Sequence, residues 1–196
     1  MTLTGSHVRL EPLDLRHAEG LALAATHDRS TYAFTHVPAS VDEAVTYIDS
    51  ALERDDQLPF ATIRLGDGVV VGSTRFLELS FWHSDDTDPS SCEIGATWLA
   101  HDAQRTAINT EAKLLQLTHA FEVWGCLRVQ LKTDARNERS RAAIIRIGAT
   151  FEGVLRNFQP ALPGPGPRDT AVYSITDAEW PDVKADLQSR VSADQA

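Results

Sequence analysis

Hydrophobic and polar residues alternate along several short stretches of the chain, a pattern typical of strands with one buried face. Residues 127–133 alternate most strictly, and residues 7–13 do so near the start. Between such stretches, apolar residues recur every three or four positions, as on the buried side of a helix. The pattern predicts strands at 7–13, 58–65, 69–79, 92–99, 127–133, 150–158 and 170–175.

Helices are predicted between these strands because their apolar positions follow helical spacing and capping residues precede them. The side chains placed to cap them are Asp14, Ser40 with Glu43, Asn137, and Thr176 with Glu179. In the first two helices the predicted buried positions are Leu15, Ala18, Leu21, Ala22, Ala25, Val41, Val45, Ile48 and Leu52. Gly148 suits the end of the fourth helix, where a left-handed conformation is common.

The order of elements is β-α-α-β-β-β-α-β-α-β-β-α, with no internal repeat. Helices that interrupt a mixed sheet predict an α/β (α+β) single domain, which we place at residues 1–188. The strand–helix–strand unit at 92–133 is expected to be a right-handed crossover between parallel strands. The proline-rich segment 160–167 predicts a turn, and residues 189–196 are expected to form a disordered tail.

Composition and charge exclude several classes of function. The 196 residues are 42% hydrophobic and carry a net charge of −10. This charge opposes binding to nucleic acid, and no apolar run approaches the ~20 residues that a membrane helix needs. The first residues lack the basic and apolar regions of a secretory signal. We therefore expect a cytoplasmic protein with no nucleic-acid or membrane partner, and the excess of arginine over lysine indicates a GC-rich, bacterial genome.

Metal and disulfide chemistry are not predicted. Cys92 and Cys126 are too few and too far apart for a zinc pattern or a disulfide framework. The seven histidines show no zinc-site spacing on a predicted helix. The two cysteines are expected to be small buried residues.

The segment 98–113 carries the strongest functional pattern, which is a strand end, a short polar turn and a helix start. An apolar stripe from Leu114 to Trp124 continues at helical spacing, so the turn at Gln104–Asn109 is expected at a helix N-terminus. Unpaired backbone N–H groups and the helix dipole attract phosphate there, and Arg105 adds a charge with suitable geometry. The pattern predicts a phosphate-bearing ligand without identifying it, and an ordinary strand–turn–helix connection is the alternative.

Three segments between Glu93 and Gly148 resemble a known family in their order and spacing. They read Glu93-Ile-Gly-Ala-Thr-Trp-Leu99, Gln104-Arg-Thr-Ala-Ile-Asn-Thr-Glu-Ala-Lys113 and Asn137-Glu-Arg-Ser-Arg-Ala142. Together they resemble the GNAT superfamily of acyl-CoA-dependent N-acetyltransferases, and within it the Rim-type branch of ribosomal-protein alanine N-acetyltransferases. The resemblance covers nearly the whole chain. It implies a mixed, mostly antiparallel sheet flanked by helices and splayed between the fourth and fifth predicted strands.

The resemblance also implies a binding site for acetyl-CoA between those two strands. Trp98 and Leu99 would pair with the pantetheine arm, and Asn137 would hydrogen-bond it. The family's pyrophosphate loop, Gln/Arg-x-x-Gly-x-Gly/Ala, is here Gln104-Arg105-Thr106-Ala107-Ile108-Asn109, so neither glycine is kept. Alanine adds only one methyl group, and asparagine tolerates the left-handed region better than most residues. The loop, through Thr110, is therefore expected to bind the pyrophosphate.

Acetyl transfer to an amine needs a neutral amine, a stabilised oxyanion and a stabilised leaving thiolate. Family members transfer directly in a ternary complex, so Cys92 is not required as a nucleophile. Glu93 is the candidate base, acting through a water, and a structural ion pair is its alternative role. Ser140 is the candidate for protonating or hydrogen-bonding the sulfur, and a first-turn hydrogen bond is its alternative. A backbone N–H near Leu99 is the expected oxyanion donor.

The acceptor amine stays open between a protein N-terminus, as in the Rim branch, and a small molecule. Acidic side chains in the loop 80–91 favour a cationic acceptor, and a homodimer is the family-level expectation. A non-catalytic acyl-CoA-binding sensor or partner-binding module on the same fold is the main alternative function. A nucleotide-phosphate loop is disfavoured because neither Gly-x-x-x-x-Gly-Lys nor Gly-x-Gly-x-x-Gly is present.

Overall fold

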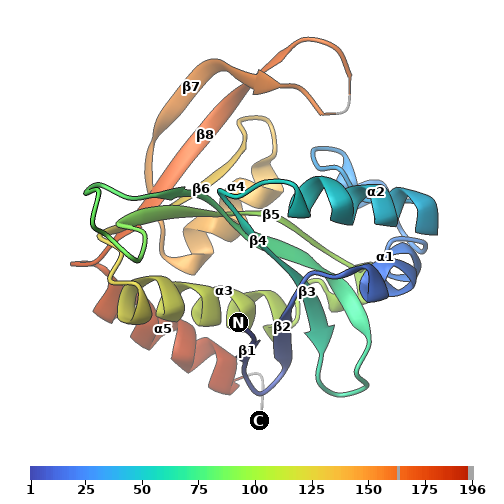
Figure 1. Ribbon diagram of the computed structural model, residues 1–196, viewed down its shortest axis with the longest axis horizontal. Coiled ribbons are helices and arrows are strands. Elements are labelled where there is room, and N and C mark those ends of the chain that lie inside the picture. The colour runs from blue at the N-terminus through green and yellow to red at the C-terminus, as the bar shows by residue number, and fades with distance from the viewer. Residues whose placement is uncertain (163, 194–196) are drawn as a thin grey trace.

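One sheet of eight strands, in the order β1-β2-β3-β4-β5-β6-β8-β7, spans the computed structural model, which describes residues 1–162 and 164–193 (Figure 1). The strands are β1 (Leu3–Thr4), β2 (Val8–Pro12), β3 (Leu58–Arg64), β4 (Val70–Ser80), β5 (Ser91–Leu99), β6 (Arg128–Asp134), β7 (Thr150–Pro160) and β8 (Pro167–Thr176). The α-helices are α1 (Ala18–Ala24), α2 (Val41–Leu52), α3 (Ala107–Thr118), α4 (Glu138–Ile147) and α5 (Trp180–Ala193). Neighbouring strands are antiparallel except β5 and β6, which confirms the predicted mixed, mostly antiparallel sheet.

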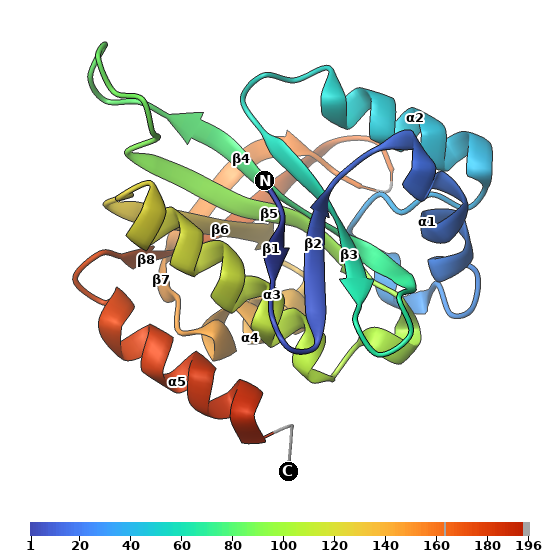
Figure 2. The ribbon, with the colours of Figure 1, turned by 60° about the horizontal axis from the view of Figure 1, so that its bottom comes forward.

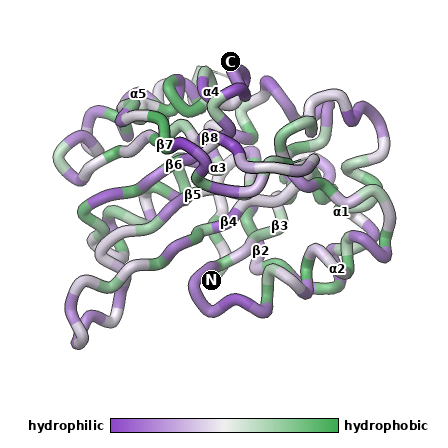
Figure 3. The backbone as a smooth tube through the Cα atoms, turned by 90° about the horizontal axis from the view of Figure 1, so that it is seen from above, coloured by the Kyte–Doolittle hydropathy of each residue, from purple (hydrophilic) through white to green (hydrophobic). Residues whose placement is uncertain are grey.

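Helices cover both faces of this sheet. α1 and α2 pack together on one face, and α3 packs with α5 on the other (Figure 2). Hydrophobic and hydrophilic segments alternate along the helices (Figure 3), as expected for elements with one buried side. Phe60, Phe76 and Tyr173 are among the largest fully buried side chains of the core. Within the described residues, no helix has the length and apolar character that a membrane span requires.

The predicted helices form, but parts of their buried faces differ from the predicted ones. Val41 and Leu52 of α2 are 44% and 51% exposed, and Leu15, before α1, is 52% exposed. The buried side chains of α2 are Ala44, Tyr47, Ile48 and Ala51. Hydropathy favours Val and Leu, whereas alanine is also among the residues most often fully buried because it fits a close approach to a sheet.

The last helix is longer than the sequence predicts. α5 continues to Ala193, past the expected start of a disordered tail at residue 189. Val191 is buried one helical turn after the fully buried Leu187, so the apolar face of the helix extends into the predicted tail. Residues 194–196 of that tail lie outside the described residues.

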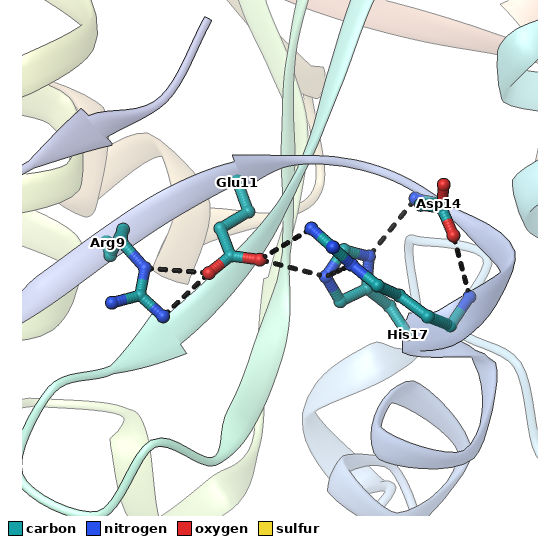
Figure 4. Close-up of polar contacts among 5 residues, drawn as sticks. Arg9, Glu11, Asp14 and His17 are labelled. Carbon is teal, nitrogen blue, oxygen red and sulfur yellow. Dashed lines mark hydrogen bonds and ion pairs between the residues drawn. The ribbon is translucent and has the colours of Figure 1, made fainter.

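Hydrogen bonds at the start of α1 confirm Asp14 as a capping residue (Figure 4). Asp14 Oδ1 accepts from the Arg16 N–H at 2.9 Å, in a 3-10 turn that leads into α1. The Asp14 N–H donates to His17 Nδ1 at 3.1 Å, and the other ring nitrogen lies 3.3 Å from Glu11 Oε2. The buried histidine thus ties the end of β2 to the first helix.

β5 and β6 stay paired only from Ser91–Arg128 to Glu93–Gln130. Beyond Glu93 the two strands separate, so a gap widens between their C-terminal ends. A bulge in β5 accompanies the separation, because the register with β4 shifts between Gly95 and Trp98 and Ala96 has a φ of 47°. Bulges bend a strand and raise its twist. The predicted splay is confirmed between β5 and β6, and we call this opening the β5–β6 gap.

β7 forms one edge of the sheet, and none of its residues is buried. Its pairing with β8 is interrupted twice, around Gly153 and around Asn157, which has a φ of 53°. These interruptions bend the strand, and the β7–β8 hairpin curves at the top of Figure 1. The exposed large apolar side chains of β7 are Phe151, Val154, Leu155 and Phe158.

A buried carboxylate of α3 holds the beginning of the chain. Glu111, which is 4% exposed, accepts hydrogen bonds from the backbone N–H groups of Ser6, His7 and Val8 at 2.7, 2.6 and 2.8 Å. Successive N–H groups in a turn form a favourable site for an anion. The contact joins the β1–β2 turn to the helix that follows β5.

Candidate active site

The open end of the β5–β6 gap leads to the N-terminus of α3. After β5, a 3-10 turn at His101–Ala103 precedes Thr106, whose Oγ1 accepts from the Ile108 N–H at 3.3 Å and caps the helix. The first N–H groups of a helix have no partner within it, and the threonine satisfies one of them. Arg105 and Thr106 are exposed beside this helix start. The strand–turn–helix unit therefore forms where the sequence predicts it.

The loop adopts its conformation without the glycines of the family pattern. Ala107 and Asn109 are the first and third residues of α3 and are helical. The left-handed residue is Arg105, with a φ of 61°. Asn109 was expected to compensate for a missing glycine by tolerating the left-handed region, and this expectation is wrong because the strained position falls four residues earlier.

Gln104 braces the end of β5 with its side chain. Its Nε2 donates to the Leu99 carbonyl at 2.8 Å and to Thr31 Oγ1 at 3.0 Å, while its Oε1 accepts from Arg139. The Tyr32 hydroxyl donates to the same carbonyl at 3.0 Å. The sequence did not indicate a role for Tyr32, because the residue comes from the loop between α1 and α2, far away in the chain.

The first turn of α4 lies beside this loop through the contact between Arg139 and Gln104. Asn137 Oδ1 accepts from the Ser140 N–H at 3.0 Å, which confirms the predicted cap of α4. Ser140 is half-buried, and its backbone N–H makes the first-turn contact that was its alternative role. No hydrogen bond joins Ser140 to Glu93 in the part of the chain that the structure describes.

Glu93 lies at the closed end of the gap, in the last residue pair that joins β5 to β6. Its Oε2 is 2.8 Å from Lys132 Nζ, which also lies 2.6 Å from Glu78 Oε1. Burial raises the pKa of the Glu93 carboxyl, and the Lys132 ammonium offsets part of that rise. The ion pair foreseen as the alternative role of Glu93 is present, and a raised pKa also suits a general base.

The predicted site residues therefore lie toward two ends of one gap. Gln104 to Thr110 lie at the open end, next to the first turn of α4, and Glu93 lies at the closed end. The offset from Glu93 to Leu99 corresponds to about 20 Å of extended strand. The bulge that was expected near Leu99 is at Ala96, between the two ends.

The acidic loop between β4 and β5 lies beyond the closed end of the gap. It leads into Ser91, which still pairs with Arg128 of β6, and it projects from the sheet in Figure 2. Asp86 Oδ2 accepts from the His83 N–H and the Ser90 hydroxyl, both at 3.0 Å, and so stabilises the loop itself. A cationic acceptor stays a prediction.

The two cysteines are buried, as predicted. They lie close enough for a thiol–thiol hydrogen bond, which, with burial, raises the pKa of the Cys92 thiol. The Cys126 thiol also donates to the Pro89 carbonyl at 3.0 Å. A thiol whose pKa is raised is a poor nucleophile at neutral pH, in agreement with direct transfer.

A lysine of α3 is buried beneath the β5 bulge, with no carboxylate partner in the described parts of the chain. Lys113 Nζ donates to Thr74 Oγ1 and Thr97 Oγ1 at 2.8 Å and to Gln116 Oε1 at 3.0 Å. Thr97 follows Ala96 directly, so the network ties α3 to the bulge and to β4. Burial lowers the pKa of Lys113 to about 7.

Lys113→Met is expected to remove a pH dependence of stability. An unfolded lysine has a pKa of about 10.4, so between about pH 7 and 10 the unfolded chain binds a proton that the folded protein does not. The free energy of unfolding of the parent should therefore rise with pH, by about 1.4 kcal/mol per pH unit around pH 8 to 9.5. Below about pH 7, Lys113 binds a proton in both states and adds no slope. Urea unfolding across this range should show the slope in the parent and in a Lys184→Met control, and equal slopes in all three proteins would contradict the prediction.

Comparison with known proteins assigns this arrangement to a family. The family model described as an acetyltransferase (GNAT) domain matches residues 7–150. The chain belongs to the GNAT acetyltransferase family. A solved GNAT structure, a GCN5-related N-acetyltransferase from Brucella melitensis, is 30% identical in sequence and has a TM-score of 0.87, over 97% of this chain and 85% of that chain.

Two solved structures with bound ligands share the fold at lower identity. Mycobacterium smegmatis RimJ in complex with CoA-disulfide is 22% identical, with a TM-score of 0.76 over 93% of this chain and 88% of that chain. The Microcin C7 self immunity acetyltransferase MccE, in complex with acetyl-CoA and AMP, is 21% identical, with a TM-score of 0.72 over 88% and 93%. A comparison with curated proteins gave no significant match. The GNAT resemblance is thus confirmed, and the Rim-type branch stays a prediction.

Proposed function

We propose that this GNAT protein is an acetyl-CoA-dependent N-acetyltransferase that moves the acetyl group directly to an amine in a ternary complex. The β5–β6 gap supports this most strongly, because it has a helix N-terminus with Arg105 at one end and the buried carboxylate of Glu93 at the other. Family membership favours acetyl-CoA as the acyl donor. Within the family, we propose the Rim-type branch on the three sequence segments between Glu93 and Gly148.

Acetyl-CoA is expected to bind along the gap. The N–H groups of residues 105–110, apart from the Ile108 N–H that Thr106 already caps, and the Arg105 guanidinium suit a pyrophosphate. Trp98 and Leu99 line the strand end that the pantetheine arm would follow. Asn137 would contribute its amide N–H groups, because its Oδ1 already accepts from Ser140.

The proposed reaction forms a C–N bond and breaks the C–S bond of the thioester. Glu93 accepts the amine proton through a water, and a backbone N–H at the Ala96 bulge is the donor proposed for the oxyanion. The leaving thiolate takes up a proton, with Ser140 as the candidate donor or hydrogen-bond partner. The acceptor is either a protein N-terminus or a small-molecule amine.

Calorimetric titration with acetyl-CoA, CoA and ATP, followed by thiol-release assays with a panel of amines, tests the proposal. Micromolar binding of acetyl-CoA, far weaker binding of ATP, and amine-dependent thiol release would support the enzyme. Tight CoA binding with no turnover across a broad amine panel, and no effect of Glu93→Gln, would instead support a non-catalytic acyl-CoA sensor or partner-binding module. No binding of acetyl-CoA would overturn both functions.

Arg105→Glu is expected to weaken acetyl-CoA binding at least tenfold, because a charge-assisted hydrogen bond of about 1.5–3 kcal/mol is replaced by repulsion. Arg54→Glu carries the same charge change at the far end of the sheet, near the start of β3, and should leave binding unchanged. Calorimetry on both variants measures the difference. Equal affinities would mean that the pyrophosphate lies elsewhere.

A further inference from the structure

Lys132 lies between two carboxylates from two other strands. Its Nζ is 2.8 Å from Glu93 Oε2 of β5 and 2.6 Å from Glu78 Oε1 of β4. The Lys132 side chain is only 3% exposed, and its ammonium lies 5.2 Å from the centre of the Phe158 ring of β7. One ammonium therefore forms ion pairs with two carboxylates at the closed end of the β5–β6 gap.

Glu78 reaches this position through a bulge in β4. Leu77 pairs with Glu93, so simple alternation would direct the next side chain to the opposite face of the sheet. The register shifts between Leu77 and Ser80, and Glu78 has a φ of 50°. Bulges re-aim side chains, and a left-handed conformation at a residue other than glycine persists where the surrounding structure requires it. The strained residue is thus the one that contacts Lys132.

The two acids differ in their access to water. The Glu78 side chain is 49% exposed, whereas that of Glu93 is 8% exposed. The charged groups that act on Glu93 are Lys132 from β6, Glu78 from β4 and Arg168 from β8, and its neighbour on its own strand is the Cys92 thiol. Lys132 and Glu78 therefore have opposite electrostatic effects on the same buried carboxylate.

We propose that Lys132 and Glu78 are positioning residues for acetyl transfer, with Lys132 holding the Glu93 carboxylate at the closed end of the gap and Glu78 weakening that hold by sharing the ammonium. The inference rests on the proposed function, in which Glu93 is the base. Neither residue needs to touch the acetyl group or the amine. Both act through Glu93.

The pH profile of kcat, measured at saturating acetyl-CoA and amine, tests the proposal. The rate should rise with pH as Glu93 loses its proton. Lys132→Met removes the cation, so nothing offsets the effect of burial on Glu93. The acidic limb of the profile should therefore move to higher pH by about one unit or more. In Glu78→Gln, Glu93 is the remaining carboxylate partner of the Lys132 ammonium, so the acidic limb should move to lower pH by about half a unit. A purely structural role would lower the rate without moving the limb in opposite directions.

The controls separate this inference from the proposed function. Lys132→Arg should keep the limb of the parent, and so should Glu122→Gln, which removes a carboxylate from the surface residue Lys184. If Lys132→Met fails to fold, the downward shift of Glu78→Gln decides. If the acidic limbs of Lys132→Met and Glu78→Gln match that of the parent while Glu93→Gln is inactive, the positioning roles are overturned and Glu93 stays the base. A fully active Glu93→Gln enzyme would remove the base, and with it this inference.

Discussion

Glu93→Gln is expected to lower kcat at least a hundredfold, since loss of a general base typically costs about 10²–10⁴-fold. Glutamine keeps the shape of the side chain but cannot accept the proton of the attacking amine. The affinity for acetyl-CoA should stay within about twofold, because the phosphate end of the gap lies about 20 Å away along β5. Thiol-release kinetics and calorimetric titration measure the two quantities separately.

Glu122→Gln is the matched control for this variant. Glu122 Oε1 lies 2.6 Å from Lys184 Nζ on the surface, so its replacement also removes a carboxylate from a lysine. This control should keep the parental kcat. The thermal midpoint of both variants should be recorded, so that a lower rate is not mistaken for a lower folded fraction. A Glu93→Gln enzyme that is well folded and works at full rate would exclude the residue from the mechanism.

Glu111→Gln is expected to destabilise the fold by about 4 kcal/mol. Hydrogen bonds to charged groups contribute about 1.5–3 kcal/mol each, and the carboxylate accepts three of them from the β1–β2 turn. Glutamine keeps one carbonyl oxygen and turns an N–H donor toward other N–H donors. The thermal midpoint should fall by about 10 °C for a chain of this size. Urea unfolding measures the change in free energy directly.

Glu19→Gln, at an exposed position of α1, controls for the loss of a negative charge. Its free energy of unfolding should change by no more than about 0.5 kcal/mol. A loss below about 1 kcal/mol in Glu111→Gln would show that water satisfies the three N–H groups instead.

The sequence was sufficient to predict the layout of the fold because the signals involved are local. Alternation located the long strands, and the caps at Asp14 and Asn137 marked helix starts that the structure confirms. The strand–turn–helix unit at 98–113 also forms where predicted. Each of these features depends on residues within a few positions of one another.

The rest of the site depends on contacts between distant segments. Glu111 and Lys113 fall inside the segment that the sequence singled out, yet their partners lie on β1–β2, β4 and β5. Glu78 reaches Lys132 only through a bulge, which an alternating pattern cannot reveal. Tyr32 reaches Leu99 from a loop more than sixty residues earlier. No local signal in the sequence identifies these pairs.

The outermost strands of the sheet are poor templates for strand pairing with a neighbouring copy of the chain. β1 has two residues, and the pairing of β7 with β8 breaks at Gly153 and Asn157. A long, straight edge that carried Phe151, Val154, Leu155 and Phe158 would be a template for intermolecular strand addition and fibril growth. The bends of β7 thus have a protective consequence, because they leave an apolar edge too irregular to propagate a sheet from one molecule to the next.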